Sequence, residues 1–386
     1  MADPVVITGM GILSSLGRDA PSTWQGVKEG RCGASTVSFL AGSDWPVRIG
    51  HEIKNFQSPD DAHLPRPTQF AIQAATEALD QANLPDKIHQ LGSKTGCYMG
   101  AGIGAISPQE ILQQLQDYKL EAEFSGLVAH LEKRGHNLLT RHHPHSLTQC
   151  LANKFSVAGP KKTFTTACSA SAQAIGHAYR AIQRGEIDLA IVGGADSIVG
   201  EILMLGFCLL GVMSQHNDSP QQAGKPFDRK RDGFVIGEGA AILILESKSH
   251  AKARAARPFA TICGYGESEN AFRITDLPED GAGAIAAMRS ALQDSRLTGC
   301  DIGAINTHGT GTEPNDRIEA QAIAQVIGNE ATVTANKANF GHLIAAAGAI
   351  ECATSVMMIK DCLVPPIANF EQSDCYFFDS ETGDRL

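Results

Sequence analysis

The chain has 386 residues, 43% of them hydrophobic, which is enough for one large or two ordinary globular domains. Its 42 acidic residues outnumber 32 basic ones, for a formal net charge of -10, and it contains no Lys/Arg-rich run, which argues against a nucleic-acid partner. No apolar run reaches the roughly 18 residues of a membrane span, and the first residues lack the regions of a signal peptide, so we expect a cytoplasmic protein.

Short β-branched runs alternate with helical patterns along the whole chain, which predicts a layered α/β fold. In the first half we predict strands at Val5–Thr8, Thr95–Met99, Thr163–Thr166 and Leu189–Val192, and helices at Pro21–Glu29, Thr68–Ala82 and Cys168–Arg184. The first strand is expected to turn at Gly9-Met10-Gly11, and the last helix to stop at Gly185. The polar, glycine-broken stretch at about 105–145 is interpreted as an inserted cap region outside the main layers.

A second series of elements follows a boundary near residue 255. We predict strands at Ala260–Ile262, Ala304–Asn306 and Thr332–Thr334, and helices at Gly281–Gln293, Asn315–Val326 and His342–Ile359. Both series end in a strand, a turn that bears Cys or His, and a helix of small residues. This order indicates a duplicated architecture with halves at 1–255 and 256–386.

One of the ten cysteines has a distinctive position. The cysteines are scattered singly and form no C-x-x-C pair, which is typical of small buried residues. Cys168, however, lies directly after a β-rich run and directly before a predicted helix. Its sulfur is then expected at a helix N-terminus, where unpaired N–H groups favour the thiolate. Position alone leaves a nucleophile and a core residue equally open.

Two histidine segments complete a possible reaction centre. His308 ends an apolar strand and precedes a loop of small and hydroxyl residues, and Lys337 lies five residues before His342, which we expect to begin a helix. A helix N-terminus disfavours the imidazolium and keeps such a histidine neutral. A thiolate could carry an acyl group while two neutral imidazoles stabilise the enolate that forms as carbon dioxide leaves a second thioester. This chemistry needs neither metal nor redox cofactor.

The three segments together resemble the signature motifs of the β-ketoacyl-(acyl carrier protein) synthase family, the condensing enzymes of fatty-acid and polyketide synthesis. The motifs are Thr166-Ala167-Cys168-Ser169-Ala170-Ser171, His308-Gly309-Thr310-Gly311-Thr312 and Lys337 to His342. Similar segments occur at Val5–Gly11, Gly193–Asp196, Lys225–Phe234 and Gly237–Ala240, so the resemblance covers most of the chain.

The resemblance implies a thiolase fold, five layers in the order α-β-α-β-α built from two similar halves. It implies that Cys168 is the nucleophile, that His308 and His342 stabilise the decarboxylating malonyl thioester, and that Lys337 supports both histidines. The remaining implied roles are phosphopantetheine binding by Thr310 and Thr312, an acyl-pocket aromatic at Phe207, and supporting carboxylates at Glu319 and Glu351. The implied partners are acyl carrier protein and, in a dimer, a second copy or a related subunit.

The chain also departs from the family pattern. Family members finish with a strand that carries a Gly-Phe-Gly-Gly turn, which is absent before Leu386. Either another subunit or a rearrangement fills this gap, or the chain is shortened or incompletely represented, which we favour; the second half is then expected to lack its last strands and part of its oxyanion hole. Gly211 stands where fatty-acid members carry an arginine. Gln109 would make the far end of the acyl pocket polar, which suits an unsaturated or oxygenated chain.

Other interpretations fit these residues less well. The main alternative is a non-catalytic partner subunit of the chain-length-factor type, although such partners usually lack the nucleophilic cysteine. A thiolase is a weaker alternative, because thiolases use a Cys-His-Cys set. Gly9-Met10-Gly11 lacks the third glycine of a dinucleotide fingerprint. His142, His143 and His145 favour a solvated surface cluster over a metal site.

Overall fold

The computed structural model describes residues 3–58, 61, 64–84, 88–102, 143–273 and 277–375. Most of the expected cap region, and Gln109 within it, lie outside these residues. Within them, a six-stranded sheet has the order β5-β4-β6-β7-β1-β8. Its strands are β1 Val5–Leu13, β4 Thr95–Ala101, β5 Lys161–Phe164, β6 Leu189–Ser197, β7 Glu238–Ser247 and β8 Ala260–Ile262. Two smaller sheets pair β9 Ala304–Asn306 with β10 Thr332–Thr334, and β2 Ser35–Thr36 with β3 Ile49–Gly50.

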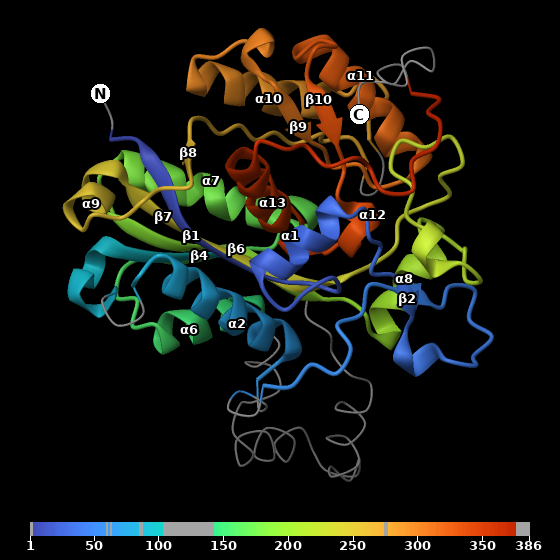
Figure 1. Ribbon diagram of the computed structural model, residues 1–386, viewed down its shortest axis with the longest axis horizontal. Helices are drawn as coiled ribbons and strands as arrows, with labels where there is room; N and C mark the ends of the chain where they lie inside the picture. Colours follow the sequence, from blue (N-terminus) through green and yellow to red (C-terminus); the bar gives the residue numbers. More distant parts are fainter. Residues whose placement is uncertain are drawn as a thin grey trace, which may run out of the picture.

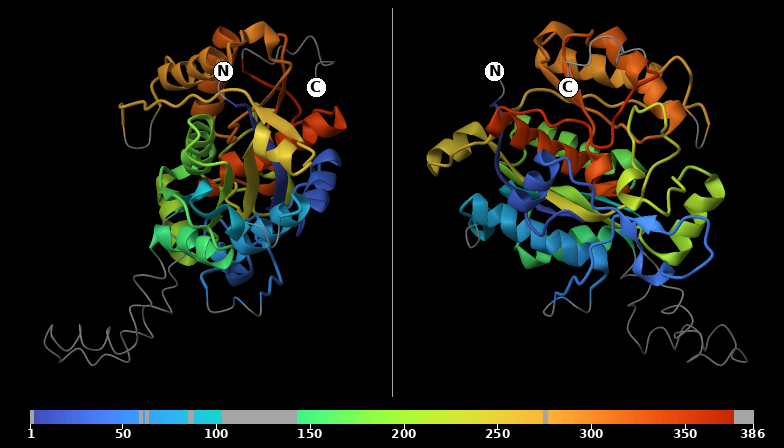
Figure 2. Two further views of the ribbon diagram at one scale, coloured as in Figure 1. Left: turned by 90° about the vertical axis from the view of Figure 1, so that its left-hand side faces the viewer. Right: turned by 45° about the vertical axis from the view of Figure 1, so that its right-hand side comes forward.

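Helices cover both faces of the large sheet and the outer side of β9 and β10. The helices are α1 Ala20–Lys28, α2 Arg66–Gln81, α6 Pro144–Lys154, α7 Ala170–Gln183, α8 Glu201–Leu210, α9 Lys248–Ala253, α10 Ala282–Ser295, α11 Glu313–Val326, α12 Lys337–Phe340 and α13 Ala347–Asp361. Helices α2 and α6 pack on one face of the sheet, and α7 and α13 on the other (Figure 1). Beyond α7 and α13 lie β9 and β10, and then α10 and α11, so the layers follow the order α-β-α-β-α (Figures 1 and 2). This is the predicted arrangement.

The central strands are buried along their whole length, as expected for a sheet covered on both faces. One hydrophobic cluster joins them to α1, α7 and α13, and another joins them to α2 and α6. Strand β7, in the middle of the sheet, was not predicted. Its apolar run Ala240–Leu245 has the continuous pattern of a fully buried strand, which could have identified it.

The first strand is longer than predicted, and the turn expected at Gly9-Met10-Gly11 is wrong. Strand β1 runs through these residues to Leu13, with an irregularity between Ile7 and Gly9. A Cβ atom at Gly9 would lie 2.1 Å from the carbonyl oxygen of Ala78, and one at Gly11 2.0 Å from that of Ala74. The two glycines therefore let the backbone of α2 approach the strand, and they do not form a turn.

The first predicted strand of the second series, β8, joins the large sheet and not the other strands of its own series. β8 pairs antiparallel with Val5–Ile7 of β1, at the edge of the large sheet. In the described part of the second half, the strands that pair with each other are β9 and β10, in parallel. Local sequence identified β8 as a strand but could not select its partner, because that depends on which sheet edge is free.

Candidate active site

Cys168 lies in the connection between β5 and α7. The sequence predicted that the helix begins at Cys168, but a 3₁₀ turn, Ala167–Ser169, precedes α7, so the cysteine lies two residues before the observed helix start at Ala170. Ala167 takes a left-handed φ of 48°, a conformation that stores about 1–3 kcal/mol of strain in a residue with a Cβ. The turn directs the thiol at His342, with Sγ 3.1 Å from Nε2.

The expectation that the helix start makes Cys168 a ready thiolate is not supported. Burial raises the pKa of its thiol to about 11, and the positive charge of Lys337 opposes that increase only in part. Cys168 therefore rests as a thiol. It must lose its proton during its reaction with substrate, because the free site does not stabilise the thiolate.

The structure also corrects the position of His342. The residue lies before a 3₁₀ turn, Ile344–Ala346, and α13 begins only at Ala347. Its imidazole is nevertheless neutral, because burial lowers its pKa well below the usual value and Lys337 and His308 lower it further. The neutral state was predicted, whereas its cause is burial beside a cation and not a helix terminus.

The hydrogen bonds fix which nitrogen of each imidazole carries the proton. The backbone N–H of Ile344 donates to Nδ1 of His342 at 3.2 Å. The Lys337 ammonium lies 3.2 Å from Nδ1 of His308 and, as a donor, holds that nitrogen as an acceptor. Both neutral rings therefore carry hydrogen on Nε2. The rings stand almost perpendicular, at 85° with centroids 5.3 Å apart.

Lys337 is the buried cation of the site. Its side chain is 3% exposed, and its ammonium donates to the backbone oxygen of His308 and forms an ion pair with Glu351. Burial raises the pKa of the Glu351 carboxyl, and the charge of Lys337 opposes this. The same cation is the second cause, after burial, of the lowered pKa of His308. Lys337 thus adds to the effect of burial in keeping both imidazoles neutral.

Two carboxylates shape the loop that follows His308. Glu319 accepts hydrogen bonds from the backbone N–H groups of His308 and Gly309, at 2.7 and 2.8 Å. Burial raises the pKa of its carboxyl to about 7 against the effect of these bonds. Asp316, which the sequence analysis did not select, accepts from the N–H groups of Thr310 and Gly311. Its position in the first turn of α11, just after the loop, is the signal that could have found it.

Thr310 and Thr312 pair with each other, and Phe207 packs against a second aromatic ring. The Thr310 and Thr312 hydroxyls are 2.8 Å apart in the loop beyond His308. Phe207 on α8 contacts Phe234, with ring centroids 5.6 Å apart, and Phe234 in turn lies 5.3 Å from the ring of His342. The aromatic residue against the His342 imidazole is therefore Phe234, and Phe207 contacts that imidazole only through Phe234. Gly211 ends α8 with a left-handed φ of 65°, a conformation that an arginine would adopt only with strain.

Ligand atoms of Cys168, His308 and His342 all lie within 4.8 Å of one another, close enough for a tetrahedral metal. The tautomers oppose that use. Each Nδ1 is held as an acceptor, so each Nε2 carries the hydrogen that a metal would have to displace. His143 and His145 have other contacts: the first caps α6, and the second lies 2.8 Å from the Thr163 hydroxyl. The site presents hydrogen-bond donors.

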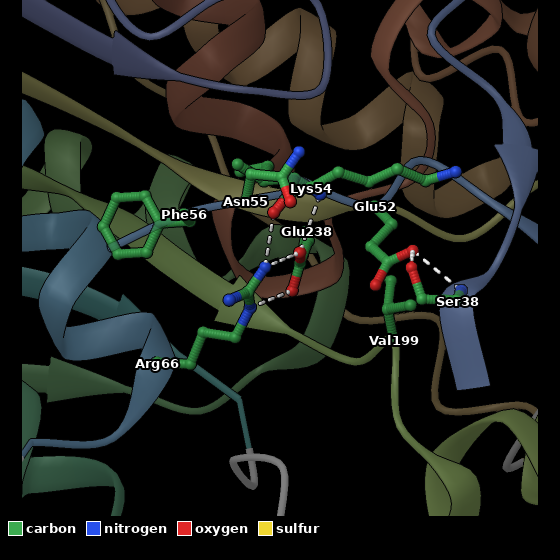
Figure 3. A pocket seen from close by; sticks show the side chains of 9 residues that line it. Ser38, Glu52, Lys54, Asn55, Phe56, Arg66, Val199 and Glu238 are labelled. Atoms are coloured by element: carbon green, nitrogen blue, oxygen red, sulfur yellow. Dashed lines mark hydrogen bonds and ion pairs between the residues drawn. The ribbon is translucent and has the colours of Figure 1, made fainter. Parts of the chain in front are cut away.

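A separate cavity of about 240 Å³ lies near the start of α2 and is lined by charged side chains. Figure 3 shows the Arg66 guanidinium facing the carboxylate of Glu238, while Glu52 turns toward Ser38. Glu238 also accepts from the hydroxyl of Ser197 at the end of β6. Through Glu238, these contacts join the start of α2 and the start of β7 to the end of β6, which leads toward the candidate active site.

In the part of the chain that the structure describes, no helix is both long and apolar enough to cross a membrane. Family models match nearly the whole chain. Residues 2–251 match the N-terminal domain of beta-ketoacyl synthase, and residues 259–371 match its C-terminal domain.

Two curated relatives are each 33% identical to the chain. A 3-oxoacyl-[acyl-carrier-protein] synthase 2 of Vibrio harveyi aligns with 96% of this chain and 89% of its own length. A putative polyketide beta-ketoacyl synthase 1 of Streptomyces halstedii aligns with 97% of this chain and 90% of its own length.

Solved structures agree with these matches. A beta-ketoacyl synthase from Burkholderia phymatum STM815 has a TM-score of 0.86 and 30% identity, over 98% of this chain and 91% of its own. The ishigamide ketosynthase/chain length factor has a TM-score of 0.83 and 29% identity, over 97% and 90%. A ketosynthase bound to a hexaketide and complexed with its type II polyketide synthase acyl carrier protein has a TM-score of 0.82 and 26% identity. The match covers 97% of this chain and 90% of that one.

Proposed function

Because the chain belongs to the β-ketoacyl synthase family, we propose that it is an acyltransferase that joins a Cys168-bound acyl group to malonyl-acyl carrier protein with loss of carbon dioxide. The observation that carries this proposal is the convergence of one thiol and two Nε2–H donors, with Sγ of Cys168 3.1 Å from Nε2 of His342. The product is a β-ketoacyl-carrier protein in fatty-acid or polyketide synthesis, including polyenes.

In the first step, the sulfur of Cys168 attacks the thioester carbonyl of the acyl-carrier protein. The carrier's C–S bond breaks, and its sulfur leaves as a free thiol that takes up the proton lost by Cys168. Because burial raises the pKa of Cys168 to about 11, this proton must be transferred as the new bond forms. The resting thiol is thereby protected from other electrophiles until a thioester fills the site.

In the second step, malonyl-carrier protein loses carbon dioxide. The electron pair of the breaking C–C bond forms an enolate, whose oxygen accepts hydrogen bonds from the Nε2–H groups of His308 and His342. Such preorganised donors are worth roughly 10²–10³ in rate each. The enolate carbon attacks the carbonyl carbon of the Cys168 thioester, the bond between that carbon and the Cys168 sulfur breaks, and the released thiolate takes up a proton from water. Every atom comes from the two thioesters and water, so the proposal requires no metal or redox cofactor.

The loop beyond His308 is proposed to hold the phosphopantetheine arm. The Thr310 and Thr312 hydroxyls are 2.8 Å apart, and Asp316 fixes the backbone between them, so they present a rigid polar edge. Glu319 holds the start of the same loop. Thiolase-like halves at 1–255 and 256–386 then contribute the thiol and the two imidazoles respectively.

The proposed partners are acyl carrier protein and a second ketosynthase-like subunit. Strand β5 forms the edge of the large sheet among the described residues, and Thr165, Thr166 and Ala167 beyond it are exposed next to the nucleophile. An open edge strand is a natural surface for pairing with another chain. We propose a dimer through this edge, with a second copy or a related subunit, and a cytoplasmic location.

Intact-protein mass spectrometry after mixing with acyl-carrier protein tests the first step. Wild type should gain the mass of one acyl group, and Cys168→Ala should gain none. Cys362→Ala, which removes an exposed thiol at the end of α13, is the matched control and should be acylated like wild type. An unmodified wild type that still pairs with an active synthase would instead favour the chain-length-factor role.

A further inference from the structure

Asp196 is a buried carboxyl group close to the proposed active site. It is the second-last residue of β6 and is 1% exposed. One oxygen accepts from the N–H of Ser197 at 2.9 Å, and the other accepts from the N–H of Ala345 at 3.1 Å. Ala345 lies three residues after His342, so this side chain joins the large sheet to the segment that bears the imidazole.

The segment that Asp196 holds is strained. Ile344 takes a left-handed φ of 38°, which is a genuine outlier for a β-branched residue. In this conformation its N–H points at Nδ1 of His342, at 3.2 Å. Strain of this kind persists only where neighbouring contacts fix the backbone on both sides.

The contacts on the two sides of the strained residue differ. The backbone of His342 is fixed by Val235, whose oxygen accepts its N–H at 2.8 Å, and by Gly237, whose N–H donates to its oxygen at 3.0 Å. On the other side, Ala345 donates to Asp196, and the Ala346 N–H donates to the oxygen of Leu343. The Ala345–Asp196 bond ties this side of the turn to the rigid sheet.

We propose that Asp196 is a positioning residue for His342: its carboxyl group clamps the strained turn and so keeps the Ile344 N–H on Nδ1, which leaves the hydrogen of His342 on Nε2. This deepens the proposed function, since it assigns the group that sets the donor used on the enolate. Asp196 itself touches neither thiol nor substrate.

The surroundings of Asp196 suit a clamp. A Cβ atom at Gly102 would lie 2.4 Å from one carboxyl oxygen, so the backbone of that glycine covers the group. Burial raises the pKa of Asp196 to about 7, yet both protonation states keep an oxygen that accepts from Ala345. The neighbouring Ser197 is anchored in turn by Glu238.

Carbon dioxide release from malonyl-carrier protein measures the effect on turnover. Asp196→Ala should lower kcat about tenfold to a hundredfold, the usual effect of removing a partner of a buried hydrogen bond, with KM for the carrier unchanged. Asp196→Asn, which keeps an oxygen acceptor, should recover most of that loss. The matched control is Glu77→Ala, which removes a partly buried carboxyl group on α2 that also accepts two backbone N–H groups. It should retain the wild-type kcat, and an equal fall in kcat would overturn the positioning role.

A double-mutant cycle with Ile344→Gly separates clamping from general damage. Glycine adopts a left-handed φ without strain, so the turn no longer depends on the clamp. In the Ile344→Gly background, Asp196→Ala should lower kcat only a few-fold. The full single-variant loss in that background would contradict the proposal.

Nitrogen NMR of ¹⁵N-histidine-labelled protein gives a readout that needs no turnover, with the His342 signal assigned from His342→Ala. Wild type and Asp196→Asn should show hydrogen on Nε2 of His342, and Asp196→Ala should show hydrogen mainly on Nδ1, in line with the loss of kcat. An unchanged tautomer in a folded Asp196→Ala refutes the clamp. If wild type releases no carbon dioxide but Asp196→Ala still shows the tautomer change, the proposed function is refuted and the clamp is supported.

Discussion

Replacement of Lys337 by methionine tests the electrostatics of the site. The substitution removes the ammonium that contacts Nδ1 of His308 and pairs with Glu351, while it keeps an apolar side chain of similar length. The partner carboxylate, whose side chain is 14% exposed, is then left without its cation. Breaking a buried pair from one side costs about 3–5 kcal/mol of unfolding free energy.

The pH dependence of that loss follows from the carboxylate. Burial already raises the pKa of Glu351, and without Lys337 nothing opposes that increase, so its folded pKa lies above the unfolded value of about 4.3. Such a group stabilises the fold below its unfolded pKa, and that stability disappears as pH rises through the folded pKa. Lys337→Met should therefore lose stability relative to wild type as the pH is raised from 5 to 8.

Denaturant unfolding of three proteins checks this reasoning. Lys337→Met should show the full loss at pH 8, and Lys337→Met/Glu351→Gln should recover most of it, because the double variant has no buried unpaired charge. Neither variant should release carbon dioxide at the wild-type rate, since His308 loses the contact that holds Nδ1 as an acceptor. If the double variant is no more stable than the single one, the pair does not act as described.

Three further predictions concern the thiol, the loop and the aromatic contact. Because burial raises the pKa of Cys168 to about 11, its alkylation by iodoacetamide should rise about tenfold per pH unit from pH 7 to 10, and a plateau below pH 8 would contradict this. Thr310→Val and Thr312→Val should each lower kcat/KM for a malonyl-pantetheine thioester about twofold to tenfold, the value of one neutral hydrogen bond, and unchanged kinetics would remove the threonines from the binding site. Phe234→Leu should lower the carbon dioxide release rate more than Phe207→Leu, because Phe234 contacts the His342 ring, and the reverse order would refute that arrangement.

Much of the site could be predicted because its signals are local. Cys168, His308 and His342 each follow or precede a regular element and are flanked by small residues, and the structure brings them together with Lys337. Long-range packing explains what was missed. The position of Phe234 between Phe207 and His342 depends on segments that meet only in the folded chain.

The protonation states of the site residues were harder to predict from sequence than the positions of those residues. Helix termini can be predicted from sequence, so they were used to explain a thiolate at Cys168 and a neutral His342. Burial governs both groups instead, and burial depends on how the two halves pack around them. The strained φ of Ile344 was equally hidden, since nothing in an apolar helical pattern marks a residue that tertiary contacts hold in a left-handed conformation.

The central claim, carbon–carbon bond formation at Cys168, is tested most directly by a single-turnover experiment. Enzyme first acylated on Cys168 is mixed with malonyl-carrier protein, and both proteins are weighed by mass spectrometry. The account predicts that the enzyme returns to its unmodified mass while the carrier bears a β-ketoacyl chain two carbons longer than the starting acyl group. An acyl group that stays on Cys168, or that leaves by hydrolysis while the carrier gains no chain, would contradict it.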